Sequence, residues 1–208
     1  ATPNLRSTLN PEHPNAQPAF SVEPFEYLSV LVSIIVGLGL SHLLATTARL
    51  IQHRTEVRLF GPTLIWMVLL FVLQVQIWWA AFEWQASGAW NFFSFLLFLG
   101  LPIGAYLLSV LLVPDLDDPE EVDLRTSYFD NRRWFFAILV LLPVISLAHE
   151  QVQGGHIQWD VDAAFRIGFG VVALAGLVVR QVAAHWVLTI GFSLGFAAYV
   201  GLLFSRLP

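Results

Sequence analysis

The sequence contains no cysteine and no lysine, and the two absences exclude several kinds of functional site. Without cysteine the chain can form neither disulfides nor thiolate metal centres. Without lysine it has no phosphate-cradling glycine-rich loop of the kind that ends in lysine. All ten cationic side chains are arginines. Any functional site must therefore be built from other side chains.

Charged side chains are scarce, since they make up 12% of the chain while hydrophobic residues make up 57%. A soluble domain usually carries about a quarter charged residues, and a body of this size lacks the interior volume to bury so many apolar side chains. We therefore expect a lipid bilayer to surround most of the chain. The net charge of -5 argues against nucleic acid as a partner.

Six stretches are long and apolar enough to cross a membrane, which takes roughly 20 residues of helix. They cover residues 27–51, 62–84, 90–113, 133–149, 163–179 and 184–204. A backbone in lipid must satisfy its own hydrogen bonds, so each span is expected to be helical. The predicted fold is an all-α integral membrane helical bundle over residues 26–208. Residues 1–25, with five of the eleven prolines, are expected to form an extended tail.

The arginines indicate an orientation, because cytoplasmic loops of membrane proteins carry an excess of positive charge. Seven arginines fall on one predicted side and three on the other. The larger set is Arg49, Arg54, Arg58, Arg125, Arg132, Arg133 and Arg180. We expect that side to be cytoplasmic, which places both termini in the periplasm.

The longest predicted loop covers residues 114–133 and is rich in acids. Asp118, Pro119 and the two glutamates that follow are typical of a helix start. They predict a short surface helix to about Ser127, separate from the fourth span. The acids form either a solvated face or a docking surface for a basic partner.

Polar and ionisable residues inside the spans are costly in lipid and usually face protein or water. The candidates are His42, Gln74, Gln76, Glu83, Glu150 and Arg166. We expect an ion pair between Arg166 and one of the glutamates. This pair either holds helices together or forms part of a proton or ion pathway.

Small residues spaced four apart share one helix face and let membrane helices approach closely. The predicted packing residues are Ser29, Ser33, Gly37 and Ser41 in the first span, Gly100 and Gly104 in the third, and Ser193, Ala197 and Gly201 in the sixth. These faces serve either packing within the chain or the docking of another membrane subunit.

Three cofactor hypotheses rest on single features. His149 and His156, with acids nearby, are candidate zinc ligands, although their spacing matches no known metal motif. His42, with His185 as a second candidate ligand, is a possible haem or chlorin site. The aromatic run over residues 78–84 fits either anchoring at the membrane interface or a shelf for a quinone or pigment.

Several segments resemble a group of uncharacterised bacterial membrane proteins of about this length. The resemblance lies in the segments beginning at Phe25, Gly37, Trp78 and Tyr128, which read FEYLSV, GLGLSHLL, WWAAFE and YFDNRRWFF. It implies a bacterial inner membrane and no established activity, so it assigns no role to any residue.

Three functions remain open from the sequence. The first is a non-catalytic accessory subunit of a larger membrane complex, with a respiratory or photosynthetic complex as one setting. The second is a small transporter or channel with a path along His42, Gln74, Gln76 and Glu83, and hinges at Pro102 and Pro143. The third is a membrane redox or metal-dependent enzyme.

Overall fold

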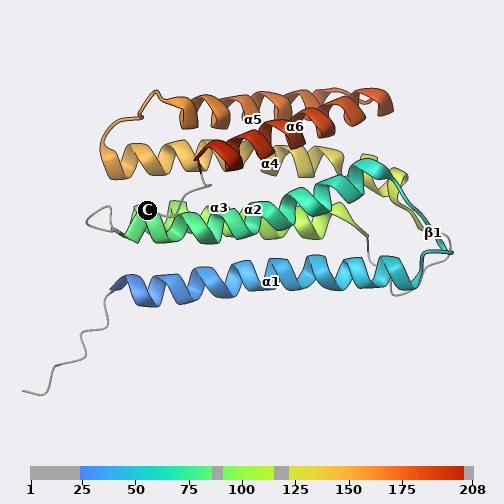
Figure 1. Ribbon diagram of the computed structural model, residues 1–208, viewed down its shortest axis with the longest axis horizontal. Helices are drawn as coiled ribbons and strands as arrows, with labels where there is room; N and C mark the ends of the chain where they lie inside the picture. Colours follow the sequence, from blue (N-terminus) through green and yellow to red (C-terminus); the bar gives the residue numbers. More distant parts are fainter. Residues whose placement is uncertain (1–23, 86–90, 115–121, 204–208) are drawn as a thin grey trace, which may run out of the picture.

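The computed structural model describes residues 24–85, 91–114 and 122–203. Six helices in these ranges are long and apolar enough to cross a membrane. They are α1 (Pro24–Gln52), α2 (Gly61–Gln85), α3 (Phe92–Leu112), α4 (Leu124–Gly154), α5 (Val161–Val178) and α6 (Val182–Leu203) (Figure 1). The predicted all-α membrane bundle is confirmed, while the tail over residues 1–23 lies outside the described residues.

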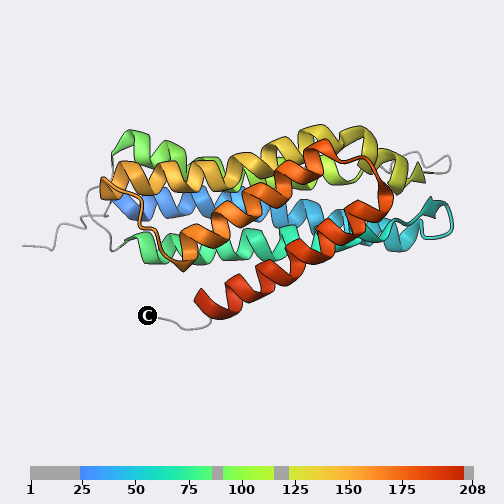
Figure 2. The same ribbon diagram turned by 90° about the horizontal axis from the view of Figure 1, so that it is seen from above.

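The helices run back and forth, so the start of α1 and the end of α6 lie at the same end of the bundle (Figures 1 and 2). We call this the terminal end. The opposite end carries the α1–α2, α3–α4 and α5–α6 connections, and we call it the arginine-rich end after Arg49, Arg54, Arg58 and Arg180. Which end faces the cytoplasm stays a prediction from the arginine count.

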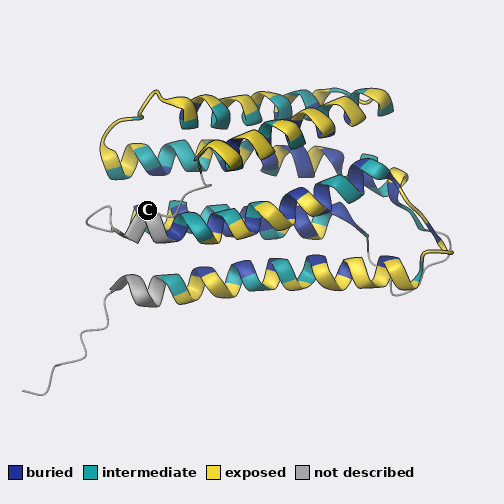
Figure 3. Ribbon diagram, viewed as in Figure 1, coloured by how far each residue is buried: buried dark blue, intermediate teal, exposed yellow. Residues whose placement is uncertain are grey.

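Large apolar side chains cover much of the outer surface, whereas several polar ones lie inside. Figure 3 shows that exposed positions occur along the membrane-spanning helices. Val178 is 77% exposed and Phe92 is 72% exposed, while Gln74 and His185 are 0% exposed. The core is mostly apolar, as in a soluble protein, but the outer surface is unusually rich in large apolar side chains. This distribution suits a lipid environment, where apolar side chains need no burial and polar ones need protein partners.

Glycines allow the closest helix contacts. A Cβ atom on Gly104 of α3 would lie 2.6 Å from Leu142 of α4, and one on Gly100 would lie 3.1 Å from Ile145. A Cβ atom on Gly176 of α5 would overlap the ring of Phe136. The predicted packing residues of α3 thus serve contacts within the chain.

The small residues of α1 and α6 divide between inner and outer positions. Ser33 accepts a hydrogen bond of 3.2 Å from Nε1 of Trp78 on α2, whereas a Cβ atom on Gly37 would meet nothing. On α6 the Ser193 hydroxyl donates to the backbone of its own helix at 2.7 Å. Among the other predicted positions, Ser29 is half-buried, while Ser41, Ala197 and Gly201 are exposed.

Two short strands pair at the arginine-rich end. β1 (Val57–Arg58) and β2 (Val122–Asp123) run parallel, with Val57 opposite Val122. This pair connects the α1–α2 segment to the start of α4. It is a small departure from the purely helical prediction.

The start of α4 corrects the predicted fourth span. The helix begins at Leu124, not at 133, and continues without a break to Gly154. Asp123 caps it, accepting hydrogen bonds from the Arg125 N–H at 3.0 Å and the Thr126 hydroxyl at 2.9 Å. The separate surface helix ending near Ser127 is therefore wrong, because residues 124–127 form the first turn of α4. Asp118 lies outside the described residues.

The Asp123 cap makes one end of α4 sensitive to acid. Its hydrogen bonds with Thr126 and the Arg125 N–H lower the pKa of the Asp123 carboxyl below the usual 3.8. The ionised cap therefore contributes its full stabilisation above about pH 4 and loses it as the pH falls through the lowered pKa. We expect Asp123→Asn to remove this component. The check is the difference between wild-type and variant melting temperatures from pH 5 to pH 2.5, which should shrink toward acid.

The Gly176 contact gives a test of packing with a control on the same helix. Gly176→Ala should lower the free energy of unfolding by about 1–3 kcal/mol, because the buried Phe136 ring must move. Gly168→Ala, also on α5, should change it by less than about 1 kcal/mol, because the new methyl group meets open space. Denaturation of both variants in mixed detergent micelles measures the difference. Equal effects would contradict the close contact between α4 and α5 at Gly176.

Candidate functional site

A cavity of about 490 Å³ opens at the terminal end of the bundle, between α2, α3 and α4 on one side and α5 and α6 on the other. Its lining extends from Asp160, in the α4–α5 connection, to Leu139 in the middle of α4. The 11 residues of helix between Glu150 and Leu139 span about 16 Å, roughly half the thickness of a bilayer core. The cavity thus extends from the terminal end to about the middle of α4.

The mouth of the cavity is charged. Nη2 of Arg166 on α5 lies 2.8 Å from Oε2 of Glu150 on α4 and also pairs with Asp162, one helical turn earlier. Nη1 of Arg166 donates to the Ser146 hydroxyl at 3.3 Å. Oε1 of Glu150 accepts from the Gln158 N–H at 2.7 Å. The ion pair expected between Arg166 and a glutamate is therefore present, with Glu150 as the partner.

Below the mouth the wall becomes aromatic. Phe98 of α3, Phe169 of α5, and Phe192, Phe196 and Tyr199 of α6 line this part of the cavity. The centroids of the Phe169 and Phe192 rings lie 4.8 Å apart, and those of Phe169 and Tyr199 lie 5.7 Å apart. The four rings of α5 and α6 therefore form one continuous apolar surface.

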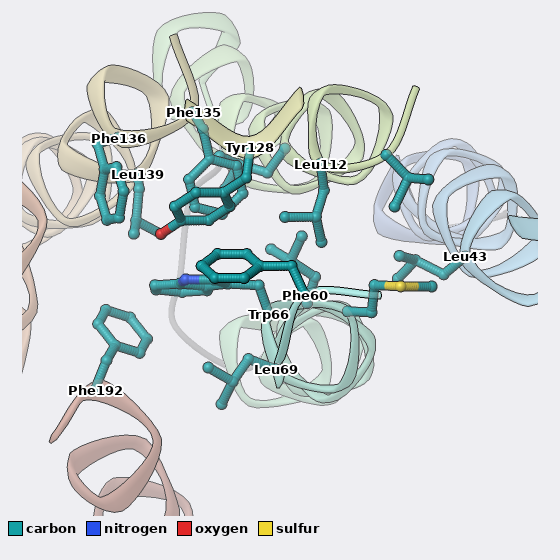
Figure 4. Close-up of a cluster of buried hydrophobic side chains, with 14 of the residues drawn as sticks. Leu43, Phe60, Trp66, Leu69, Leu112, Tyr128, Phe135, Phe136, Leu139 and Phe192 are labelled. Carbon is teal, nitrogen blue, oxygen red and sulfur yellow. The ribbon is translucent and has the colours of Figure 1, made fainter. Parts of the chain in front are cut away.

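The floor of the cavity is a tightly packed aromatic plug. Trp66 of α2 is almost fully buried, with its ring centroid 4.9 Å from that of Phe192 and 5.2 Å from that of Phe135. Figure 4 shows Phe192 pointing from α6 toward Trp66, with Tyr128 and Phe60 close by. These side chains fill the half of the bundle next to the arginine-rich end. The cavity is consequently open at one end.

The structure separates the two glutamines that the sequence placed together. Gln76 lines the cavity, whereas the fully buried Gln74 donates a 3.1 Å hydrogen bond from Nε2 to the Ser109 hydroxyl of α3. The side chain of Gln74 also fills the space left by Gly39 of α1, where a Cβ atom would overlap it. Gln74 is thus a tether between helices.

The proposed polar path is not assembled in the described part of the chain. His42 is half-buried on α1, with its ring 6.4 Å from that of Tyr106 in an edge-to-face arrangement, and it does not line the cavity. The side chain of Glu83 lies outside the described residues. Of the four predicted residues, Gln76 alone is in the cavity wall among the side chains that the structure describes.

The histidines do not form a metal centre in the part of the chain that the structure describes. His149 and His156 both line the cavity, yet no group of three or more His, Cys, Asp or Glu among the described residues could hold a metal ion. His156 is exposed, and its Nδ1 lies 3.0 Å from the Gly154 carbonyl oxygen. The zinc-site hypothesis gains no third ligand from these residues.

His185 is buried in a polar network that sequence reasoning missed. Its Nε2 lies 3.0 Å from the Val179 carbonyl, which can only accept, so Nε2 carries the proton and donates. Nδ1 then accepts from the Tyr128 hydroxyl at 3.0 Å. Arg132 donates to the same Val179 carbonyl.

Both ring nitrogens of His185 are engaged in hydrogen bonds, which argues against a haem held by His185 and His42. The burial of His185 depends on a contact between α4 and α6, which sequence reasoning did not predict.

A nucleophile-like pattern also has a structural explanation. Gly191, Ser193 and Gly195 match the Gly-x-Ser-x-Gly spacing of hydrolases. In hydrolases the serine sits on a sharp turn between a strand and a helix, but here all three residues lie inside α6. The Ser193 hydroxyl donates to the backbone of its own helix. The match therefore indicates no nucleophile.

Comparisons with protein-family models, with curated proteins and with solved structures find no match to this chain.

Removal of the Arg166 side-chain charge should destabilise the bundle. Arg166→Gln leaves Glu150 and Asp162 facing each other with 22% and 28% of their side-chain surface exposed. We expect a loss of about 1–3 kcal/mol, less than for a fully buried pair because water still screens the carboxylates. Thermal unfolding in detergent measures the loss. Arg180→Gln, at the exposed arginine-rich end, is the matched control, and an equal effect there would contradict the assignment.

The absence of cysteine makes water access to the cavity directly measurable. Gln76→Cys should react with a charged, membrane-impermeant thiol reagent, because its thiol faces the cavity and can ionise there. Gln74→Cys should be protected by helix packing, and Val75→Cys by lipid. Labelling rates followed by mass spectrometry distinguish the three positions. If Gln74→Cys reacted as fast as Gln76→Cys, water would reach a side of α2 that the structure shows as packed, which would contradict the position of the cavity.

Proposed function

We propose that the protein is a small membrane transporter whose substrate site is the cavity at the terminal end. The observation that carries this proposal is a cavity of about 490 Å³ that combines a charged mouth, an aromatic wall and a closed floor about halfway along the bundle. Its volume falls in the range of roughly 300–1,000 Å³ typical of small-molecule sites. Transporters commonly bind their substrates near the bilayer midplane, between groups of helices.

Two prolines support movement around this site. Pro102 in α3 and Pro143 in α4 lie inside continuous helices. Proline has no backbone N–H, so each one leaves the carbonyl four residues earlier without its helical hydrogen bond. Those carbonyls belong to Phe98 and Leu139, and both residues line the cavity. Helices weakened at these points bend more easily, which transport requires.

The test of transport needs no knowledge of the substrate. Alternating access exposes a cavity residue to each side of the membrane in turn, so Gln76→Cys should be labelled by an impermeant thiol reagent from both faces of oriented vesicles. Gln52→Cys, at the arginine-rich end of α1, should be labelled from its own face only. Labelling of Gln76→Cys from the terminal end alone would contradict the transporter proposal.

The second candidate function is an accessory subunit of a membrane complex. The specific observation in its favour is an apolar groove of about 390 Å³ on the outer face of α5 and α6. Ala164, Gly168, Gly191 and Gly195 line this groove, and Cβ atoms on Gly168 and Gly191 would meet nothing. Small residues of this kind let another transmembrane helix approach closely.

Retention of a partner through this groove can be tested in native membranes. Gly191→Leu should abolish copurification of a subunit that the wild-type protein retains, while the melting temperature of the isolated protein stays unchanged. Gly37→Leu, an open position on α1, is the control and should retain the subunit. If the Gly191→Leu variant retained the same subunits as the wild-type protein, the groove would not be the docking site of a partner.

A further inference from the structure

The charged groups around the cavity are unbalanced. Three carboxylates, from Glu150, Asp160 and Asp162, and one guanidinium, from Arg166, line it, which leaves an excess of two negative charges with the histidines neutral. Asp160 is exposed and caps α5 by accepting from the Ala163 N–H at 3.0 Å. The pairing of Arg166 with two carboxylates therefore does not neutralise the mouth.

An anionic ligand would meet this site unfavourably. Nη2 of Arg166 already pairs with Glu150 and Asp162, and an anion at Nε, which makes no hydrogen bond to a described residue, would still lie in a cavity with two excess negative charges. A cation is attracted by the same excess of carboxylates and needs no change in the pairing of Arg166. Charge selection at the mouth thus favours a positive ligand.

The aromatic wall favours the same ligand class. Aromatic faces attract cations through their quadrupole, and they also bury the apolar body that such a ligand carries. Phe169 and Tyr199 lie 5.7 Å apart between centroids, and both line the cavity that Asp162 and Arg166 enclose at its mouth. An inorganic cation would gain little from this apolar surface, whereas an organic cation gains from both parts of the cavity.

From these observations we infer that the cavity binds a lipophilic organic monocation, with its charge near Asp162 and Glu150 and its apolar body against Phe169, Phe192 and Tyr199. This inference rests on the proposed function for the role of the cavity, and it adds the chemical class of the substrate. It concerns binding and can be tested separately from transport.

Two probes of equal shape and opposite charge isolate the electrostatic selection. Tetraphenylphosphonium and tetraphenylborate are measured by equilibrium dialysis against lipid nanodiscs with and without the protein. The wild-type protein should retain tetraphenylphosphonium above the empty-nanodisc level and should not retain tetraphenylborate. Stronger retention of the borate, or retention of neither ion, would overturn the inference. Two-sided labelling of Gln76→Cys decides transport independently of either result.

Charge variants locate the selection at the mouth. Asp162→Asn leaves the Glu150–Arg166 pair in place and should weaken phosphonium binding about tenfold. The double variant Glu150→Gln with Asp162→Asn removes the excess of two negative charges, because Asp160 and Arg166 then balance, and should abolish the preference between the two ions. Asp123→Asn, at the opposite end of the bundle, is the control and should change neither affinity. An unchanged ion preference in a folded double variant would place the binding elsewhere.

Discussion

Polar groups at hydrocarbon depth must find their partners inside the protein, and the arrangement of this bundle follows from that requirement. The backbone meets it by forming helices. The side chains meet it by bonding between helices: Gln74 joins α2 to α3, Tyr128 joins α4 to α6, and Arg166 joins α5 to α4. Because apolar burial gives little driving force in lipid, such directional bonds and close glycine contacts fix which helices are neighbours.

The packing of α6 against α2 explains why the bundle is filled at the arginine-rich end and contains a cavity at the terminal end. At the arginine-rich end Gly61 leaves room for the ring of Trp186, so α6 lies close to the start of α2. Figure 2 shows α6 diverging from α2 toward the terminal end. The aromatic plug fills the narrow half, and the wider half contains the cavity.

The spans could be predicted from composition and length alone, because lipid imposes a minimum apolar stretch on each helix. The Arg166–Glu150 pair followed from similar depth in neighbouring spans. The different fates of Gln74 and Gln76 could not be predicted, since they face opposite sides of α2 and the sequence does not say which side meets α3. The start of α4 was missed because Arg132 and Arg133 resemble a membrane boundary, whereas Arg132 is buried against the Val179 carbonyl.

The parallel pairing of β1 with β2 has a mechanical consequence for the whole molecule. It fastens the α1–α2 connection to the start of α4 by backbone pairing, so α1, α2 and α4 are linked at the arginine-rich end. The α5–α6 pair is held to α4 at the same end by two hydrogen bonds: Arg132 donates to the Val179 carbonyl, and Tyr128 donates to His185 of α6. Separating α4 from the α5–α6 pair at the arginine-rich end would require both of these hydrogen bonds to break.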